Sequence, residues 1–206
     1  MTSPDPVVFV VDDEPVVRDT VSRMVHQFGF AVEVFESAEA FLQYARPDRP
    51  ACLILDVNLA DSSGFDLAAQ LTAGKLDLPT IFMTGQGTIP MSVRAMKTGA
   101  VEFLTKPLDQ KQLHEAIDLA LTRAVEERTR RAELEGLETR LDRLTARERQ
   151  VLAGVVAGRL NKQIAAELGI VEQTVKVHRG RIMQKLGAES VADLVRLTDR
   201  LAALRE

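Results

Sequence analysis

Apolar runs and amphipathic stretches alternate along the first half of the chain. The apolar runs are rich in β-branched residues and lie at positions 7–11, 31–35, 51–55, 79–83 and 101–104. Helix signals recur between them: Pro15 suits the first turn of a helix that ends near Gly29, and Ser37 can cap the next helix. This alternation predicts an α/β fold in which helices cover a parallel sheet.

The pattern changes after Leu108, where helical periodicity continues without strand signals. An apolar stripe comes first, formed by Leu113, Ile117 and Leu121. Residues 126–133 are then nearly all charged, and leucines resume at helical spacing after them. We interpret residues 123–142 as a helical linker. Two alternatives stay open for it: a solvated helix that spaces two domains, and a short dimeric coiled coil interrupted by Gly136.

Residues 144–206 show helical periodicity only. The piece NKQIAAELGIVEQTVKVHRGRIMQKLG contains a short helix, a turn at Gly169, and a second helix whose inward positions are Val175, Ile182 and Leu186. Two short helices around a glycine turn make a helix-turn-helix. The second helix is expected to expose a basic surface, formed by Lys176, His178, Arg179, Arg181 and Lys185. A last helix, capped by Ser190, either covers the core or joins a second subunit.

Charge is divided unevenly between the two halves. Residues 1–120 carry 17 acidic and 9 basic residues, whereas residues 121–206 carry 13 acidic and 17 basic residues. The total length of 206 residues suits one large domain or two small ones. We therefore expect an acidic, cation-binding module joined to a module that tolerates polyanions.

Membrane insertion and secretion are not expected. No apolar run approaches the roughly 20 residues needed to cross a bilayer, and the opening MTSPDP lacks the charged and apolar regions of a secretion signal. The single cysteine, Cys52, lies in the apolar run ACLIL, which favours a reduced core thiol over a metal ligand or a nucleophile. These features predict a cytoplasmic protein with no membrane partner.

Polar residues that can do chemistry follow the apolar runs. Three acids come directly after the first run: Asp12, Asp13 and Glu14. Single polar residues follow three later runs: Asp56, Thr84 and Lys106. Adjacent carboxylates repel one another unless something compensates them, and Mg²⁺ prefers oxygen ligands of this kind. A parallel sheet brings the carboxyl ends of its strands to one edge, so these residues are expected to meet there.

The acids, Thr84 and Lys106 could each carry out one part of phosphoryl transfer. With Mg²⁺ bound, a carboxylate can act as nucleophile toward a phosphoryl group. The Lys106 ammonium and the Thr84 hydroxyl can bind the oxygens of the resulting acyl phosphate.

The blocks VDDE, LILDVNLADSSGFDL, FMTGQG and FLTKPL resemble those of bacterial response-regulator receiver domains. The resemblance covers residues 6–122 and implies a five-stranded, doubly wound parallel sheet with the flavodoxin-like strand order 2-1-3-4-5. It implies Asp56 as the phosphoacceptor. It also implies a set of Mg²⁺ ligands and a conformational switch. The implied ligands are Asp13, Asp56 and the backbone carbonyl of Asn58, with Asp12 acting through water. The implied switch residues are Thr84, Phe103 and Lys106, with a cis peptide bond before Pro107.

Two rival functions use related chemistry. Haloacid-dehalogenase-like phosphatases also combine an aspartate nucleophile, Mg²⁺, a threonine and a lysine, but they place a second acid two residues after the nucleophile. Here that position is Asn58, whose amide cannot act as a general acid, so an enzyme is not expected and a Mg²⁺-dependent phosphatase stays as the alternative. A flavin carrier needs a first loop that accepts phosphate, which the acids at 12–14 would repel.

The stretch from LTARERQ to LGAES resembles the LuxR-type helix-turn-helix, and the whole chain resembles the NarL/FixJ class of response regulators, its FixJ-like members in particular. A helix beginning near Glu172 is expected to enter the major groove of DNA. The candidate DNA contacts are Lys162, Gln173, Thr174, Lys176, Val177, Arg179 and Arg181. Some family members carry a base-reading lysine where this chain has Gly180, so their base preferences are not transferred. A protein-interaction helix bundle is the alternative, and a salt-dependent gel shift on duplex DNA separates the two.

Together these observations predict three segments: a receiver domain at 6–122, a helical linker at 123–142 and a LuxR-type DNA-binding domain at 143–206. The expected partners are a sensor histidine kinase, double-stranded promoter DNA, RNA polymerase and a second copy of the chain. Phosphorylation is expected to promote the homodimer. Release of an autoinhibitory contact between the domains is the alternative mechanism.

Overall fold

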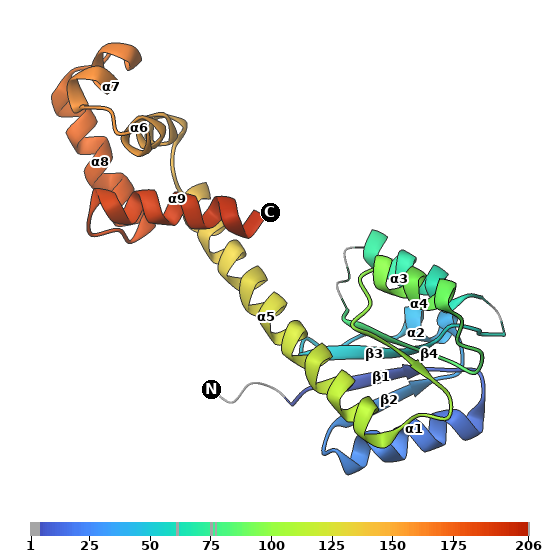
Figure 1. Ribbon diagram of the computed structural model, residues 1–206. Helices are drawn as coiled ribbons and strands as arrows, with labels where there is room; N and C mark the ends of the chain where they lie inside the picture. The colour runs from blue at the N-terminus through green and yellow to red at the C-terminus, as the bar shows by residue number, and fades with distance from the viewer. Residues whose placement is uncertain (1–4, 61, 75, 77, 206) are drawn as a thin grey trace. The chain divides into compact units, whose positions relative to one another are not determined.

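The computed structural model describes residues 5–60, 62–74, 76 and 78–205, and the chain divides into two compact units (Figure 1). The first unit spans Met1–Arg128 and the second Thr129–Glu206. Residue 206, the last of the predicted DNA-binding segment, lies outside the described residues. Among the described helices, none combines the length and the apolar character that crossing a membrane requires.

The first unit is built on a five-stranded parallel sheet in the order β2-β1-β3-β4-β5, which confirms the predicted fold and strand order. Its strands are β1 (Val7–Val11), β2 (Ala31–Phe35), β3 (Ala51–Asp56), β4 (Thr80–Thr84) and β5 (Glu102–Thr105). The helices between them are α1 (Pro15–Gln27), α2 (Ala38–Gln43), α3 (Gly64–Ala73) and α4 (Ile89–Lys97). Helix α5 (Gln110–Asp142) follows the last strand.

Side chains on the central strands face two separate cores. In β1, Val7, Phe9 and Val11 pack with residues of α2, α3 and α4, whereas Val8 and Val10 pack with residues of α1 and α5. All five are 0–1% exposed, because a central parallel strand is covered on both faces. This burial explains why the first apolar run is continuous rather than alternating. The same burial fixes the position of the carboxyl end of β1, and Asp12 is the next residue at that end of the sheet.

The predicted helix starts are confirmed at two positions. Pro15 is the first residue of α1, and the Ser37 hydroxyl caps α2 by accepting a hydrogen bond from the backbone N–H of Ala40 at 3.1 Å. The third strand runs one residue further than the apolar pattern predicts. Asp56 is its last residue, because the pairing of β3 with β4 continues to the bond from Val57 N–H to the Met83 carbonyl at 2.9 Å.

The second unit is helical, with α6 (Ala146–Val156), α7 (Asn161–Leu168), α8 (Glu172–Leu186) and α9 (Val191–Arg205). Its core contains Leu144, Val151, Ile164, Val175, Ile182 and Leu186. The three α8 positions predicted to face inward are therefore confirmed as buried. Helix α7 begins at Asn161, and its N-cap is Leu160.

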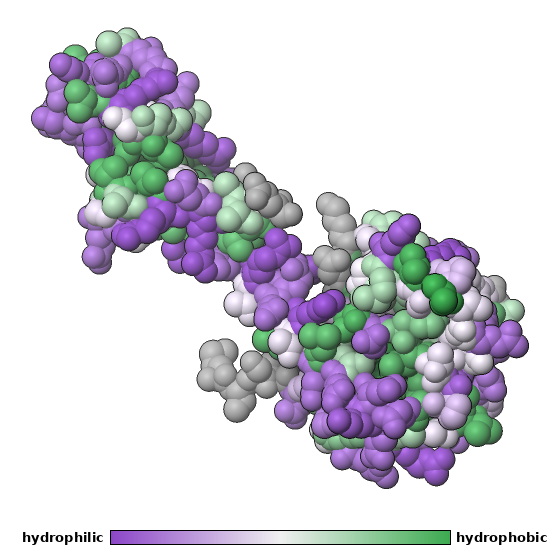
Figure 2. Space-filling view, in the orientation of Figure 1, coloured by the Kyte–Doolittle hydropathy of each residue, from purple (hydrophilic) through white to green (hydrophobic). Residues whose placement is uncertain are grey.

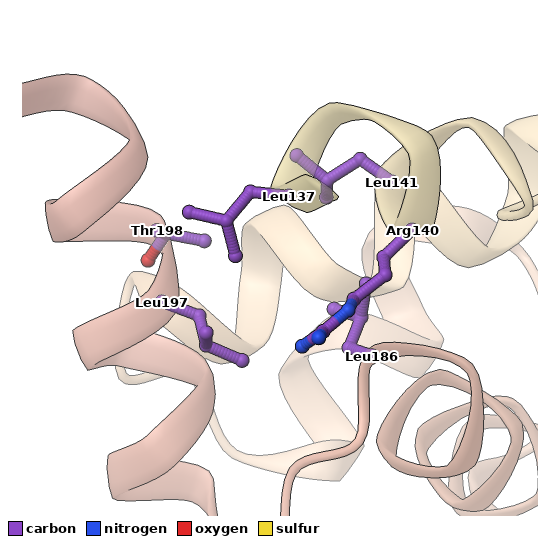
Figure 3. Close-up of a pocket in the computed structure, with 6 residues that line it drawn as sticks. All are labelled: Leu137, Arg140, Leu141, Leu186, Leu197 and Thr198. Atoms are coloured by element: carbon purple, nitrogen blue, oxygen red, sulfur yellow. The ribbon is translucent and has the colours of Figure 1, made fainter. Parts of the chain in front are cut away.

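The last turns of α5 pack within the second unit, against α8 and α9. Figure 3 shows Leu137 directed toward Thr198 and Leu197, Leu141 beside Leu137 on α5, and Arg140 extending toward Leu186. The cavity that these side chains enclose measures about 10 Å³, which is about the space of one water molecule. It is too small to hold any ligand larger than a water molecule.

Candidate functional site

Three carboxylates meet at the carboxyl edge of the sheet. Asp12 follows β1, Asp13 comes next, and Asp56 ends β3; one oxygen from each lies within 4.8 Å of the other two. Asp12 and Asp56 are buried, at 0% and 3% exposed, while Asp13 is half-buried. The acids predicted to converge are thus brought together, although Asp12 and Asp56 are far apart in the sequence.

Lys106 brings a positive charge from the end of β5 to the same cluster. Its Nζ lies 2.7 Å from Asp12 Oδ2, 3.2 Å from Asp56 Oδ2 and 3.5 Å from Glu14 Oε1. Its backbone N–H donates to the Thr84 carbonyl at 2.8 Å, which fixes its position beside β4. The peptide bond to Pro107 is cis, as the resemblance implies.

The charges of this cluster shift one another's pKa values. Burial raises the pKa of Asp56, the charge and hydrogen bond of Lys106 partly offset this, and the charge of Asp12 raises the pKa further. Burial would lower the pKa of Lys106, but its hydrogen bond and attraction to Asp12, together with Asp56, raise the pKa above its usual value. Lys106 is therefore held in its charged form. Added positive charge near Asp56 would favour its carboxylate form.

The residues of the cluster fit a magnesium ion. The donors are all carboxylate oxygens, which suit this hard cation. Asp56 Oδ1 is buried and accepts no hydrogen bond from any residue that the structure describes, so one oxygen of the central carboxylate is left for a ligand. Asn58 lies just beyond, exposed, and its backbone hydrogen-bonds to Asp56. Its carbonyl stays a predicted ligand.

Thr84 and Phe103 occupy neighbouring strands beside the cluster. Thr84, fully buried, ends β4, and its hydroxyl oxygen accepts a hydrogen bond from the backbone N–H of Gln86 at 3.3 Å. Phe103 in β5 is half-buried and packs on the core shared with α3 and α4. A Cβ on Gly87 would lie 3.6 Å from the Phe103 ring and 3.7 Å from the Thr84 methyl, so this loop covers both switch candidates.

Sequence reasoning missed two contributors to this site. Arg18 in α1 donates to the Asp12 carbonyl at 2.7 Å and so holds the first acidic loop. Gly64, at the start of α3, lies so close to β3 that an added Cβ would be 2.1 Å from the Asp56 carbonyl oxygen. Arginine at 18 carries no sequence signal. Glycine at 64 does, because a residue without a side chain permits a close approach of backbone.

In the second unit, α8 carries most of the predicted DNA contacts. Most of the predicted set is exposed: Gln173, Lys176, Val177 and Arg181 in α8, and Lys162 in α7. Thr174 is half-buried. Arg179 differs, because its guanidinium donates to Asn161 Oδ1 at 2.6 Å and joins α8 to the start of α7. Arg179 therefore has a structural partner besides any contact to DNA.

Lys185 does not belong to the open basic surface of α8 that the sequence predicts. Its Nζ lies 2.7 Å from Glu148 Oε2 and donates to the Arg143 carbonyl at 2.9 Å. Glu148 also completes a capping box with Thr145 at the start of α6. The hydrogen bond from Lys185 and the bond from the Thr145 backbone lower the pKa of Glu148 to about 2. This pair, in which Glu148 is buried and Lys185 half-buried, connects α6 to α8 and orients the exposed face of α8.

The Glu148 pair predicts an acid-sensitive second unit. A carboxylate whose pKa is about 2 in the folded chain and 4.5 without its partners stabilises the fold above about pH 4.5. That contribution is lost as the pH falls from about 4.5 to about 2. Glu148→Gln is therefore expected to speed amide hydrogen exchange in α6 and α8 at pH 6, and the difference from wild type should shrink by pH 3.

The matched control is Glu135→Gln, which removes an exposed acid of α5 in the same unit. It should leave exchange in α6 and α8 unchanged at both pH values. An exchange difference between Glu148→Gln and wild type that stays constant from pH 6 to pH 3 would contradict the assigned role of this pair.

Comparison with known proteins assigns both units. Residues 8–118 match the response regulator receiver domain family, and residues 142–198 match the bacterial regulatory proteins of the luxR family. The matched ranges contain both the acidic cluster and α8.

Relatives resemble the chain over nearly its whole length. The response regulator protein TodT of Pseudomonas putida is 44% identical over 195 residues, which are 95% of this chain and 86% of TodT. The transcriptional regulatory protein FixJ of Rhizobium meliloti is 42% identical over 193 residues, which are 94% of this chain and 95% of FixJ. A solved structure of the response regulator StyR is 47% identical, covers 96% of this chain and all of its own, and has a TM-score of 0.86. The chain therefore belongs to the NarL/FixJ-like response regulators, transcription regulators that join a receiver domain to a LuxR-type helix-turn-helix.

Proposed function

We propose that the chain is a phosphorylation-controlled transcription factor whose Asp56 accepts a phosphoryl group from a sensor histidine kinase. The observation that carries this proposal is the convergence of Asp56 with Asp12, Asp13 and Lys106 at one edge of the sheet. The receiver family implies a kinase partner of this kind.

The residues suggest how the phosphoryl group is received. One oxygen of the Asp56 carboxylate attacks phosphorus, and the new O–P bond forms as the P–N bond to the kinase histidine breaks. The electron pair of the broken bond stays on the ring nitrogen, and neutral imidazole leaves because its other ring nitrogen carries a proton. Lys106 Nζ, 3.2 Å from Asp56 Oδ2, stabilises the negative charge that collects on the phosphoryl oxygens. Mg²⁺ held by Asp12, Asp13, Asp56 and the Asn58 carbonyl would neutralise further charge on that group.

The phosphorylated state then changes the packing beside the site. A phosphate on Asp56 carries close to two negative charges and can draw the Thr84 hydroxyl away from its bond with Gln86. Phe103, half-buried next to the same loop, turns into the space that Thr84 leaves. Such a change is a shift between two packings of α4 and β5.

The surface of α4 supports dimerisation of the phosphorylated form. Three of its apolar residues are exposed at helical spacing: Ile89 (81%), Val93 (47%) and Met96 (55%). Figure 2 shows strongly apolar atoms on the surface of the first unit near α3 and α4. Basic residues Arg94 and Lys97 lie on α4, and the acidic Glu102 lies exposed on β5. A two-fold interface could pair these opposite charges around the apolar stripe.

This interface gives a direct prediction. Replacing Val93 and Met96 together with serine should keep the monomer folded, because both are exposed, but should weaken the phosphorylated dimer about tenfold or more. Analytical ultracentrifugation with acetyl phosphate and Mg²⁺ measures this. Leu119→Ser in α5, which removes another exposed apolar residue (44%), should leave the dimer unchanged; equal dimerisation of the double variant and wild type would exclude this face.

The dimer would place two copies of α8 on two half-sites of double-stranded promoter DNA. Lys176 and Val177 on the exposed face suit base contacts, and Lys162 and Arg181 suit phosphates. Linking two modules strengthens binding through effective concentration. We also propose RNA polymerase as a partner of the DNA-bound dimer, and the cytoplasm as the location of the protein.

The test uses the full chain with and without acetyl phosphate and Mg²⁺, on promoter fragments that the phosphorylated protein selects from genomic DNA. Phosphorylation should produce dimers and raise affinity for these fragments, and affinity should fall steeply with added salt because phosphate contacts release counterions. Identical affinity with and without phosphorylation would overturn the proposed control. Steady turnover of p-nitrophenyl phosphate would instead indicate the Mg²⁺-dependent phosphatase.

A further inference from the structure

Gly180 lies in the middle of α8, on its exposed face, where the fold gives no reason for a glycine. Apart from its own helix, no described atom lies within 4 Å of the position that a Cβ would take. Its φ is not in the left-handed region that favours glycine. Glycine in a helix interior destabilises the helix relative to alanine, because its unfolded backbone has more freedom to lose.

Most other glycines of the chain have a structural reason. Five have positive φ values: Gly29, Gly99, Gly158, Gly169 and Gly187. Three others would place a Cβ within 3.0 Å of a neighbouring atom: Gly64, Gly87 and Gly154. Two glycines inside helices, Gly180 in α8 and Gly136 in α5, have neither a positive φ nor a described atom within 4 Å of the position that a Cβ would take. Intramolecular packing therefore explains neither of these two glycines. Gly180 differs from Gly136 because it lies on the exposed face of α8, the helix that carries most of the predicted DNA contacts.

The neighbours of Gly180 identify the chemistry of that partner. One turn earlier on the same exposed face lie Lys176 and Val177, and one turn later lies Gln184. Arg181 follows directly and is also exposed. Gly180 is thus a gap within a row of cationic, amide and methyl-bearing side chains. Such side chains bind phosphates and base edges of a DNA duplex.

We propose that Gly180 is a specificity-determining residue of this chain. Without a side chain, it lets the duplex come into van der Waals contact with the backbone of α8, and this close approach decides which base pairs Lys176 and Gln184 reach. The inference rests on the proposed function, in which α8 lies in the major groove. It differs from a packing role because it predicts that filling the gap makes the protein more stable and its DNA binding worse.

The experiment compares the phosphorylated full chain with Gly180→Ala, Gly180→Leu and the matched control Gly136→Ala, which fills an equally open helical position elsewhere. Each protein selects sites from a library of random duplexes, and its melting temperature is measured without DNA. Both alanine variants should melt about 2–6 °C higher than wild type. Gly180→Ala should bind the wild-type site about tenfold more weakly and Gly180→Leu more weakly still, with altered preference at the central base pairs of each half-site.

The remaining outcomes each decide a separate point. If Gly180→Ala selects the same sites with the same affinity as wild type, or melts lower than wild type, the close-approach role is wrong. If Gly136→Ala changes DNA binding as much as Gly180→Ala, the effect is not local to α8 and the role is again wrong. If wild type itself selects no sequence, the proposed DNA-binding function fails, and this inference fails with it.

Discussion

Asp56→Asn is expected to abolish phosphorylation by acetyl phosphate, and with it the phosphate-dependent dimer and the gain in promoter affinity. The amide removes the nucleophilic oxygen while keeping the size of the side chain. It also removes one negative charge beside Asp12. The fold should persist, because Lys106 keeps its ion pair with Asp12 at 2.7 Å. Phosphate incorporation by intact-protein mass spectrometry and dimerisation by ultracentrifugation measure the two effects.

Asp66→Asn is the matched control, because Asp66 is an exposed acid in the first turn of α3. It should take up phosphate and dimerise as wild type does. Phosphate on Asp56→Asn at wild-type level would show that another residue is the acceptor. Normal dimerisation of unphosphorylated Asp56→Asn would break the proposed connection between phosphate and dimer, and would favour release of a contact between domains as the regulatory step.

The sheet and the acidic cluster could be predicted because they depend on strong, short-range signals. Each strand contains most of one apolar run, and Asp12, Asp56, Thr84 and Lys106 follow their runs by one or two positions. Parallel pairing then brings the strand ends together whatever the length of the connections. Asp12 and Asp56 could therefore be placed together without any knowledge of side-chain geometry.

Other features could not be predicted, because they depend on distances between elements. Lys185 has the same sequence surroundings as an exposed basic residue, and only the packing of α6 against α8 brings it to Glu148. Arg179 likewise meets Asn161 only after the turn at Gly169 sets the angle between α7 and α8. Helical periodicity tells which face a residue occupies but not which side chain lies opposite.

The close approach of α3 to β3 gives the second prediction with a large effect. Alanine normally favours a helix over glycine, by up to about 1 kcal/mol. At position 64, however, the added Cβ would lie 2.1 Å from the Asp56 carbonyl oxygen and 3.0 Å from its carbon, both backbone atoms that cannot turn aside. The clash outweighs the helix preference, because one element has to move away from the other.

Gly64→Ala is therefore expected to lower the free energy of unfolding by about 3 kcal/mol, as strong overpacking does, and to slow phosphorylation because Asp56 moves with its carbonyl. Urea unfolding measures the first effect, and acetyl phosphate uptake the second. Gly85→Ala, at a loop position with nothing within 4 Å of its Cβ among the described atoms, should change stability by less than about 0.5 kcal/mol. Equal stability of both variants would mean that α3 can move without disturbing β3, and that the position of Asp56 does not depend on this contact.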